Sequence, residues 1–247
     1  MNSAFTIKDW SAFASGLTSK PEWLAWAAAP ALPRSDATPA LADMPPMQRR
    51  RVDKLGRMAL QVAWWCQRDP VADIPLVFAS RHGDLGRTIE MLRLLVQDQP
   101  VSPTHFGLST HNAIAAQYSI ARHLTCNCVC VSAGSASAEA AVVEALGLLA
   151  DGNDDVLIVV YDEPLPAEYA EFGDEPEAAF AWTARIGRHG HGDAGYSLHV
   201  DDRQAPPDRQ PTTSLPHGLE VLRFLIGDQP ILEHRENGRT WRWSKHA

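Results

Sequence analysis

The hydrophobic pattern of this chain alternates between segments of helical period and short apolar runs typical of buried strands. In the segment 54–68, apolar residues recur at helical spacing, which predicts an amphipathic helix with one buried stripe. The stripe consists of Leu55, Met58, Val62 and Trp65. Helical period or a helix-start signal predicts further helices at 19–29, 84–98, 111–124, 135–149 and 217–226.

Residues 84–98 combine a start signal with a periodic face. Asp84 is a suitable N-terminal cap, because its carboxylate can accept a hydrogen bond from a free amide of the first turn. Behind it, Ile89, Leu92 and Val96 repeat at helical spacing. We therefore expect an amphipathic helix here.

Short apolar runs between these segments predict strands. The strongest is VLIVVYD at 156–162, which follows the predicted helix at 135–149 after a turn. Further strands are predicted at 4–14, 74–80, 128–131, 178–186, 195–200 and 239–246. This alternation of strands and helices favours a layered α/β fold with a largely parallel sheet, which the later strands would complete as edge or hairpin pieces.

Composition and charge narrow the possible partners. The 247 residues carry a net charge of −8, and basic residues are scattered apart from Arg49–Arg51, so we expect no nucleic-acid partner. The N-terminus has Lys8 and Asp9 where a signal peptide needs an apolar core, and no apolar run is long enough for a membrane span. We therefore expect a cytoplasmic globular protein without a membrane partner.

Three alternating cysteines raise the possibility of a zinc site. Cys126, Cys128 and Cys130 would point to one face of a strand, with about 6.5–7 Å between successive positions. Tetrahedral zinc, with Zn–S bonds of about 2.3 Å, holds its sulfur ligands closer together than that. We therefore interpret these residues as small buried thiols.

A second cluster, His189, His191 and Asp193, has an H-x-H-x-D spacing similar to the ligand loop of binuclear metallohydrolases. Those enzymes place a further histidine directly after the aspartate, where this chain has Ala194. A glycine-rich turn between two strands explains the same residues. We expect no metal site in the chain.

The run CVCVSAGSASAEAA, from Cys128 to Ala141, predicts a strand that turns abruptly into a helix. Enzymes often place a nucleophile at such a junction. The hydrolase signature G-x-S-x-G would need glycines where Ala133 and Ser137 stand, so Ser135 is interpreted as an early helical hydroxyl that bonds local backbone. A serine nucleophile at Ser135 remains the alternative.

Two blocks carry a family resemblance: FGLSTHNAIAAQYSIARHL, and VSAGSASAEAAVVEALGLLADGNDDVLIVVYDE. They resemble the N-terminal half of the β-ketoacyl synthases, over residues 74–163 and more loosely beyond. In that family, a run of the type V-T-A-C delivers the nucleophilic cysteine to the start of a helix. Here VSAG places Gly134 at the cysteine position.

The resemblance implies a thiolase-like layered α/β fold, with residues 1–247 forming a single truncated synthase-like domain. Synthases use a thiolate at a helix N-terminus to accept an acyl group, and glycine has no atom that can do this. The two histidines used in decarboxylation and condensation come from the second half of the family's chains, and we expect this chain, at 247 residues, to be too short to contain that half. The resemblance thus implies a subunit without catalytic residues and without a cofactor.

Within the family, such a subunit resembles the chain length factors, particularly those of type II polyketide systems that make aryl polyenes. This implies a full-length β-ketoacyl synthase and an acyl carrier protein as partners. The predicted helices at 112–124 and 135–149 are low in polarity and are candidates for the interface. Candidate interface or tunnel residues are Phe106, His111, Asn112, Ala115, Ala116, Gln117 and Tyr118. The alternative function is a stand-alone acyl hydrolase that uses Ser135.

Overall fold

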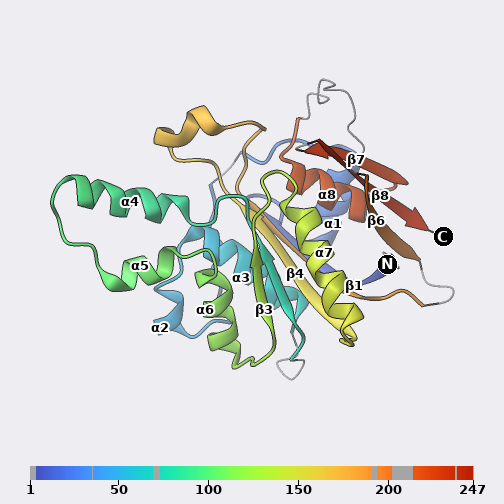
Figure 1. Cartoon of the computed structure of the whole chain (residues 1–247), viewed down its shortest axis with the longest axis horizontal. Coiled ribbons are helices and arrows are strands. Elements are labelled where there is room, and N and C mark those ends of the chain that lie inside the picture. The colour runs from blue at the N-terminus through green and yellow to red at the C-terminus, as the bar shows by residue number, and fades with distance from the viewer. Residues whose placement is uncertain are drawn as a thin grey trace.

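The computed structural model describes residues 4–34, 36–68, 73–190, 194–201, 214–236 and 238–246. Their strands form one sheet in the order β3-β2-β4-β5-β1-β6-β8-β7 (Figure 1). The strands are β1 (Ala4–Ala14), β2 (Leu76–Ala79), β3 (Cys128–Val131), β4 (Asp155–Asp162), β5 (Phe180–Arg188), β6 (Gly195–Asp201), β7 (Ile231–Glu236) and β8 (Arg239–His246). The layered α/β fold is confirmed, and β7 is a strand that the pattern analysis missed.

The largely parallel sheet expected from the sequence is wrong. Only β3, β2 and β4 run parallel to one another, with helices at 85–96, 103–109 and 113–122 between β2 and β3 and a helix at 137–150 between β3 and β4. Every other pairing, from β4 with β5 through to β8 with β7, is antiparallel. The alternation of strands and helices that favours parallel pairing describes only the segment from β2 to β4. Beyond it, β1 pairs antiparallel with both β5 and β6, and β7 pairs with β8 through a short turn.

Helices cover both faces of the sheet (Figure 1). The helices are α1 (Lys20–Ala28), α2 (Pro46–Arg49), α3 (Lys54–Cys66), α4 (Leu85–Val96), α5 (Pro103–Ser109), α6 (Ala113–Arg122), α7 (Ser137–Ala150), the 3-10 helix η1 (Ala167–Phe172) and α8 (His217–Ile226). One apolar cluster joins α1, α7 and α8 to the sheet, and another joins α3 and α6 to its other face. The predicted helices are confirmed, whereas α2, α5 and η1 were not predicted.

Strand β4 shows how the sheet separates the two clusters. Val156, Ile158 and Val160 belong to the cluster beneath α7, and the alternate residues Leu157 and Val159 belong to the cluster beneath α3. All five side chains are buried. Because side chains alternate along a strand, the continuous apolar run of β4 is what a strand buried on both faces requires.

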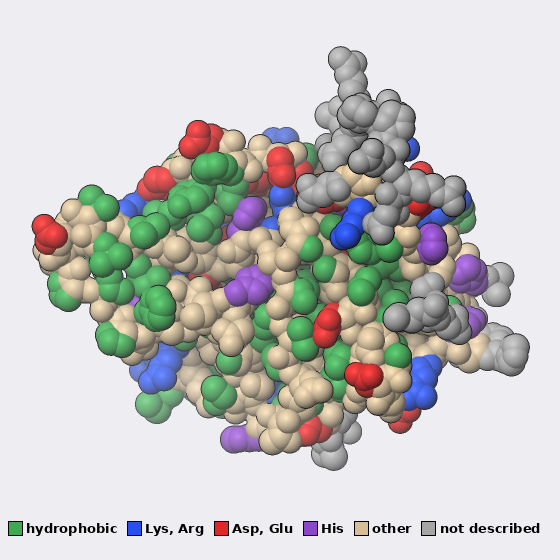
Figure 2. Space-filling view, viewed as in Figure 1, with side chains coloured by type: hydrophobic (Ala, Val, Ile, Leu, Met, Phe, Trp, Pro, Cys, Tyr) green, Lys and Arg blue, Asp and Glu red, His purple; other side chains and the backbone are tan. Residues whose placement is uncertain are grey.

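Helices α4 and α5 form an arm that extends from the body, at the left of Figure 1. Ile89 is buried, but the other residues of the predicted stripe are not: Leu92 is 43% and Val96 is 87% exposed. Phe106 on α5 is 64% exposed. Hydrophobic side chains gather over this part of the surface in Figure 2. The periodic face of α4 is therefore largely uncovered in the isolated chain.

Helix α6 presents its small residues to the core. Ala115 and Tyr118 are fully buried, and Tyr118 packs edge-on against Trp64 while its hydroxyl donates to Gln67 Oε1 at 2.9 Å. Neither side chain is exposed in the isolated chain, so neither is available there as interface surface. Ala116 lies at a half-buried position of the same helix.

The cysteines have different environments. Cys66 is buried, but Cys126 and Cys130 are half-buried and Cys128 is exposed, so the interpretation of the three strand cysteines as buried thiols is wrong. They lie at or next to β3, which is an end strand of the sheet among the described residues. Within the described residues, no group of three or more His, Cys, Asp or Glu side chains could hold a metal ion. His191 and Asp193 lie outside the described residues.

No helix in the described part of the chain is long and apolar enough to cross a membrane.

Replacing Ala115 with arginine should lower the free energy of unfolding by about 3–5 kcal/mol, because the guanidinium would enter a closed apolar cluster without a partner. Ala116→Arg is the matched control and should cost less than about 1 kcal/mol, because this position reaches solvent. Urea denaturation followed by circular dichroism compares the two variants. Equal losses of stability would contradict the orientation of α6.

Candidate functional site

The junction between β3 and α7 is a tight turn held by a serine. Gly134 has a left-handed backbone with φ +59°. Ser137 Oγ donates to the Gly134 carbonyl at 2.7 Å and accepts from the Ala133 amide at 3.0 Å. The local backbone role expected for Ser135 is therefore filled by Ser137, which leaves the Ser135 hydroxyl available for another partner.

Gly134 also lies directly beneath the β7–β8 hairpin. A β-carbon built at this glycine would approach Glu236 Oε1 to 3.0 Å, which is tighter than an ordinary van der Waals contact. The left-handed backbone adds strain for any residue with a side chain. Both observations favour glycine at this position.

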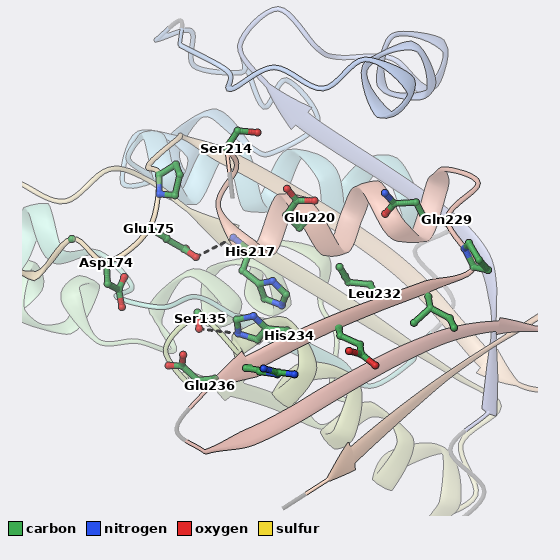
Figure 3. Close-up of a pocket in the computed structure, with 16 residues that line it drawn as sticks. Ser135, Asp174, Glu175, Ser214, His217, Glu220, Gln229, Leu232, His234 and Glu236 are labelled. Atoms are coloured by element: carbon green, nitrogen blue, oxygen red, sulfur yellow. Dashed lines mark hydrogen bonds between the residues drawn. The ribbon is translucent and has the colours of Figure 1, made fainter. Parts of the chain in front are cut away.

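The Ser135 hydroxyl is hydrogen-bonded to His234, a residue of β7. The Ser135 Oγ–His234 Nε2 distance is 2.9 Å, and both side chains face one cavity (Figure 3). On β7, Leu232, His234 and Glu236 are half-buried and alternate with exposed neighbours, so one face of the strand turns toward the junction. The sequence ILEHRE itself shows no alternation of apolar and polar residues, so the hydrophobic pattern does not predict β7.

A second histidine packs on the first. His217, the first residue of α8, is buried, and its ring stacks on that of His234 with 3.5 Å between centroids and 17° between planes. His217 Nε2 lies 2.6 Å from Glu139 Oε1. The same carboxylate oxygen accepts from Trp243 Nε1 at 2.9 Å, and Glu139 has no exposed surface.

These contacts set the charges of the cluster. Burial alone would lower the pKa of His217 and raise that of Glu139, but their mutual attraction prevails, so the pKa of His217 is raised and that of Glu139 is lowered. Burial, together with the charge of His217, lowers the pKa of His234 to about 4. These shifts favour a His217–Glu139 ion pair beside a neutral His234.

The loop before β5 binds the N-terminus of α8. Glu175 Oε2 accepts from the backbone N–H of His217 at 3.0 Å, and Glu175 Oε1 pairs with Arg81 at 2.5 Å. Arg81 also binds Asp174 at 2.6 Å, and its carbonyl accepts from Ser132 Oγ at 2.7 Å. Arg81 therefore joins this loop to the β3–α7 junction.

These elements enclose a cavity of about 1290 Å³. Its lining comprises Ser135, the loop 173–176, Ser214, His217, Glu220 and residues 229–236. Figure 3 shows His217 and His234 between α8 and the β7–β8 hairpin, with Ser135 on the junction beside them. The cavity thus brings together a hydroxyl, two imidazoles and several carboxylates.

The structure brings only some of the sequence-predicted residues to this cavity. Ser135 lines it and Gly134 is its chain neighbour, whereas none of the interface or tunnel candidates lines it. His111 is the candidate nearest to the junction, because its Nε2 lies 3.0 Å from the carbonyl oxygen of Val131 at the end of β3. His217 and His234 were missed, since no spacing in the sequence links them to Ser135.

The fold agrees with comparisons to known proteins. The family model for the β-ketoacyl synthase N-terminal domain matches residues 23–244. The chain therefore belongs to the β-ketoacyl synthase N-terminal domain family. No curated protein sequence matches it.

Solved structures place the chain among ketosynthase-like folds. A chain in the complex of the ketosynthase ApeO with its chain length factor ApeC, from Xenorhabdus doucetiae, is 28% identical, with a TM-score of 0.84 over 98% of this chain and 99% of that one. The ishigamide ketosynthase/chain length factor gives 18% identity and a TM-score of 0.63 over 81% of this chain and 67% of that one. The AntDE:AntF complex of an acyl-carrier protein with its ketosynthase gives 11% identity and a TM-score of 0.62, over 81% and 70%. The last two show the fold alone.

The Glu139–His217 ion pair predicts a pH-dependent contribution to stability. Because the folded pKa of His217 is raised, its contribution is complete below the unfolded value of about 6.5 and fades as the pH rises through the folded value. Because the folded pKa of Glu139 is lowered, its contribution is present above about 4.3 and is lost as the pH falls through the folded value. Glu139→Gln should therefore cost about 3 kcal/mol near pH 6, and less at pH 9.

Urea denaturation over this pH range measures the difference between the wild type and Glu139→Gln. Glu171→Gln, on the exposed surface of η1, is the matched control and should show a small difference at every pH. A pH-independent loss in Glu139→Gln would show that the pair is not charged in the folded protein.

Proposed function

We propose that the chain acts as a chain length factor, a ketosynthase-like subunit that pairs with an active β-ketoacyl synthase and does not itself perform condensation. The observation that carries this proposal is Gly134 at the junction after β3, where the family has its nucleophilic cysteine. A glycine offers no atom to form a thioester, and the Glu236 carboxylate lies over the space that a side chain would need. The match over nearly the whole length of a chain in the ApeO–ApeC complex supports the same role.

The surface of the arm supports pairing with another protein. Leu92, Leu95, Val96 and Phe106 are exposed together on α4 and α5. Large apolar side chains gathered on one surface are typical of an interface. Strand β3 lies at the edge of the sheet, with backbone groups on one side open to an added strand. We propose that the ketosynthase partner covers the arm and this edge.

The finer functional assignments follow from the same relatives. An acyl carrier protein would deliver the growing chain to the paired ketosynthase, and an aryl polyene would be the product class, as the resemblance to chain length factors of those systems implies. Of the candidate interface and tunnel residues, Phe106, His111, Asn112, Ala116 and Gln117 retain exposed or half-exposed surface. The sheet that runs from β1 to β8 supports residues 1–247 as one domain.

Charges on the arm should disrupt pairing without disrupting the fold. The double variant Leu95→Asp/Phe106→Asp is expected to weaken binding to a ketosynthase partner from the same genome by at least about 30-fold, because two apolar contacts would be replaced by desolvated carboxylates. Val200→Asp on β6, toward the other end of the sheet, is the matched control and should bind like the wild type.

Co-purification and biolayer interferometry measure this binding, and circular dichroism verifies the fold. If the wild type bound no ketosynthase, the proposed function would be wrong. Normal binding by the folded double variant would remove the arm from the interface.

Restoring the cysteine should not restore condensation. Gly134→Cys is expected to give no condensation product from acyl- and malonyl-carrier protein, because the thiol would lie under Glu236 on a strained backbone. The variant should also lose more stability than Gly16→Cys, where the backbone is left-handed but the space is open. Product analysis by mass spectrometry, with an active ketosynthase as the positive control, tests the first expectation. Product from the isolated variant would falsify the non-condensing role.

A further inference from the structure

We propose that Ser135 and His234 form a nucleophile–base pair that accepts an uncharged acyl group from a thioester and releases it slowly as the carboxylic acid. This activity goes beyond the proposed pairing role and does not require the missing cysteine. It rests on the 2.9 Å contact between Ser135 Oγ and His234 Nε2, on the stacked ring that orients His234, and on the cavity that both residues line.

The geometry holds the two reacting groups on separate supports. Ser135 follows the left-handed Gly134 at the start of the α7 turn, and Ser137 makes the local backbone contacts that would otherwise occupy a hydroxyl there. His234 projects from β7, and the ring of His217 lies flat against it. A base held by stacking keeps one ring nitrogen directed at the hydroxyl, as a nucleophile–base pair requires.

The steps balance with a thioester and water as the co-reactants. As Ser135 Oγ attacks the thioester carbonyl, the unprotonated Nε2 of His234 takes the hydroxyl proton. The carbon–sulfur bond breaks, and the leaving thiolate receives that proton from His234. Water then adds to the serine ester with His234 as base, and the carbon–oxygen bond breaks, which gives the carboxylic acid and a restored serine hydroxyl. No oxidant, reductant or metal is involved.

The charged groups around His234 shift its pKa and so determine how readily it accepts a proton. His217 from α8 and Arg81 from the segment after β2 disfavour its protonation, whereas Glu139 from α7 opposes them. Burial is the largest cause and also disfavours the protonated ring. The pKa of His234 therefore lies at about 4, and its ring is neutral at physiological pH. A neutral ring is ready to accept a proton, but a weakly basic one transfers it slowly. The expected reaction is therefore slow hydrolysis without pH dependence near neutrality.

The lining of the cavity selects the acyl group. The lining itself contributes five carboxylates against Arg235 and His217: Asp174, Glu175, Glu220, Glu233 and Glu236. Arg81, Arg223 and Arg242 pair with the first four of the five. A malonyl-type acyl group would bring another carboxylate into this field, and like charges repel at such distances. A simple uncharged acyl chain avoids this repulsion and fits the available volume.

Incubation of the full chain with the hexanoyl thioester of N-acetylcysteamine tests the proposal. We expect an acyl adduct that maps by peptide mass spectrometry to Ser135, together with release of hexanoic acid, and a rate at least about 10-fold lower with the malonyl thioester. Ser135→Ala should abolish both adduct and release, and His234→Gln should slow acylation by about 100-fold or more. Ser102→Ala, an exposed serine before α5 whose side chain makes no capping hydrogen bond, is the matched control and should acylate like the wild type.

The pH profile provides a readout that a structural role would not produce. The acylation rate should be flat from pH 5.5 to 8, because His234 is already deprotonated over this range. A rate that rises tenfold between pH 6 and 7.5 would assign the proton transfer to another base. No adduct on the wild type, or an adduct that persists in Ser135→Ala, would overturn the proposal.

Hexanoyl-carrier protein in place of the small thioester distinguishes the source of the acyl group. Acylation by the carrier-bound form alone would assign a protein-delivered substrate, and acylation by both forms would assign recognition of the acyl group itself. Binding of Ser135→Ala to the ketosynthase, measured in parallel, separates the two proposals. Loss of acylation with intact binding supports both, whereas an unreactive wild type that binds normally overturns only the dyad.

Discussion

The buried carboxylate of Glu139 is the constraint on which the site depends. A carboxylate without exposed surface is stable only when partners replace its water, and Glu139 finds them on two other elements, in His217 and Trp243. This requirement ties α7, α8 and β8 together. His217 is then fixed where its ring can stack on His234, which in turn reaches Ser135. The buried Glu139 carboxylate thus holds, through His217, the histidine that binds the Ser135 hydroxyl at the cavity.

The β7–β8 hairpin places different side chains against two neighbouring residues of the junction. Glu236 lies over Gly134, at the position where the family carries its nucleophile, while His234 on the same face binds the next residue, Ser135. Gly134 offers no nucleophilic atom, whereas the adjacent Ser135 has a polar partner in His234. Two adjacent residues thus have different surroundings at the same place, a glycine under a carboxylate and a serine bonded to an imidazole.

Apolar residues are buried in the sheet but lie exposed on the arm formed by α4 and α5. The strands at the centre bury apolar side chains on both faces, which stabilises the body. Helices α4 and α5 leave comparable residues in solvent, although their pattern has the period of a core-facing helix. A partner that covered them would remove this apolar surface from water, so the same pattern that stabilises a fold can also stabilise an assembly.

The sequence by itself determined the elements whose signal is local. The apolar run of β4, the stripe of α3 and the capped start of α4 were all predictable, since each depends on neighbours a few residues away. The glycine at position 134 was likewise visible through the family resemblance. The tertiary structure decided which way the later strands run, which face of α6 meets the core, and that the face of α4 meets solvent. It also brought His217 and His234 to Ser135, because contacts between residues so distant in the chain depend on how β7 and α8 pack against α7, which no local pattern encodes.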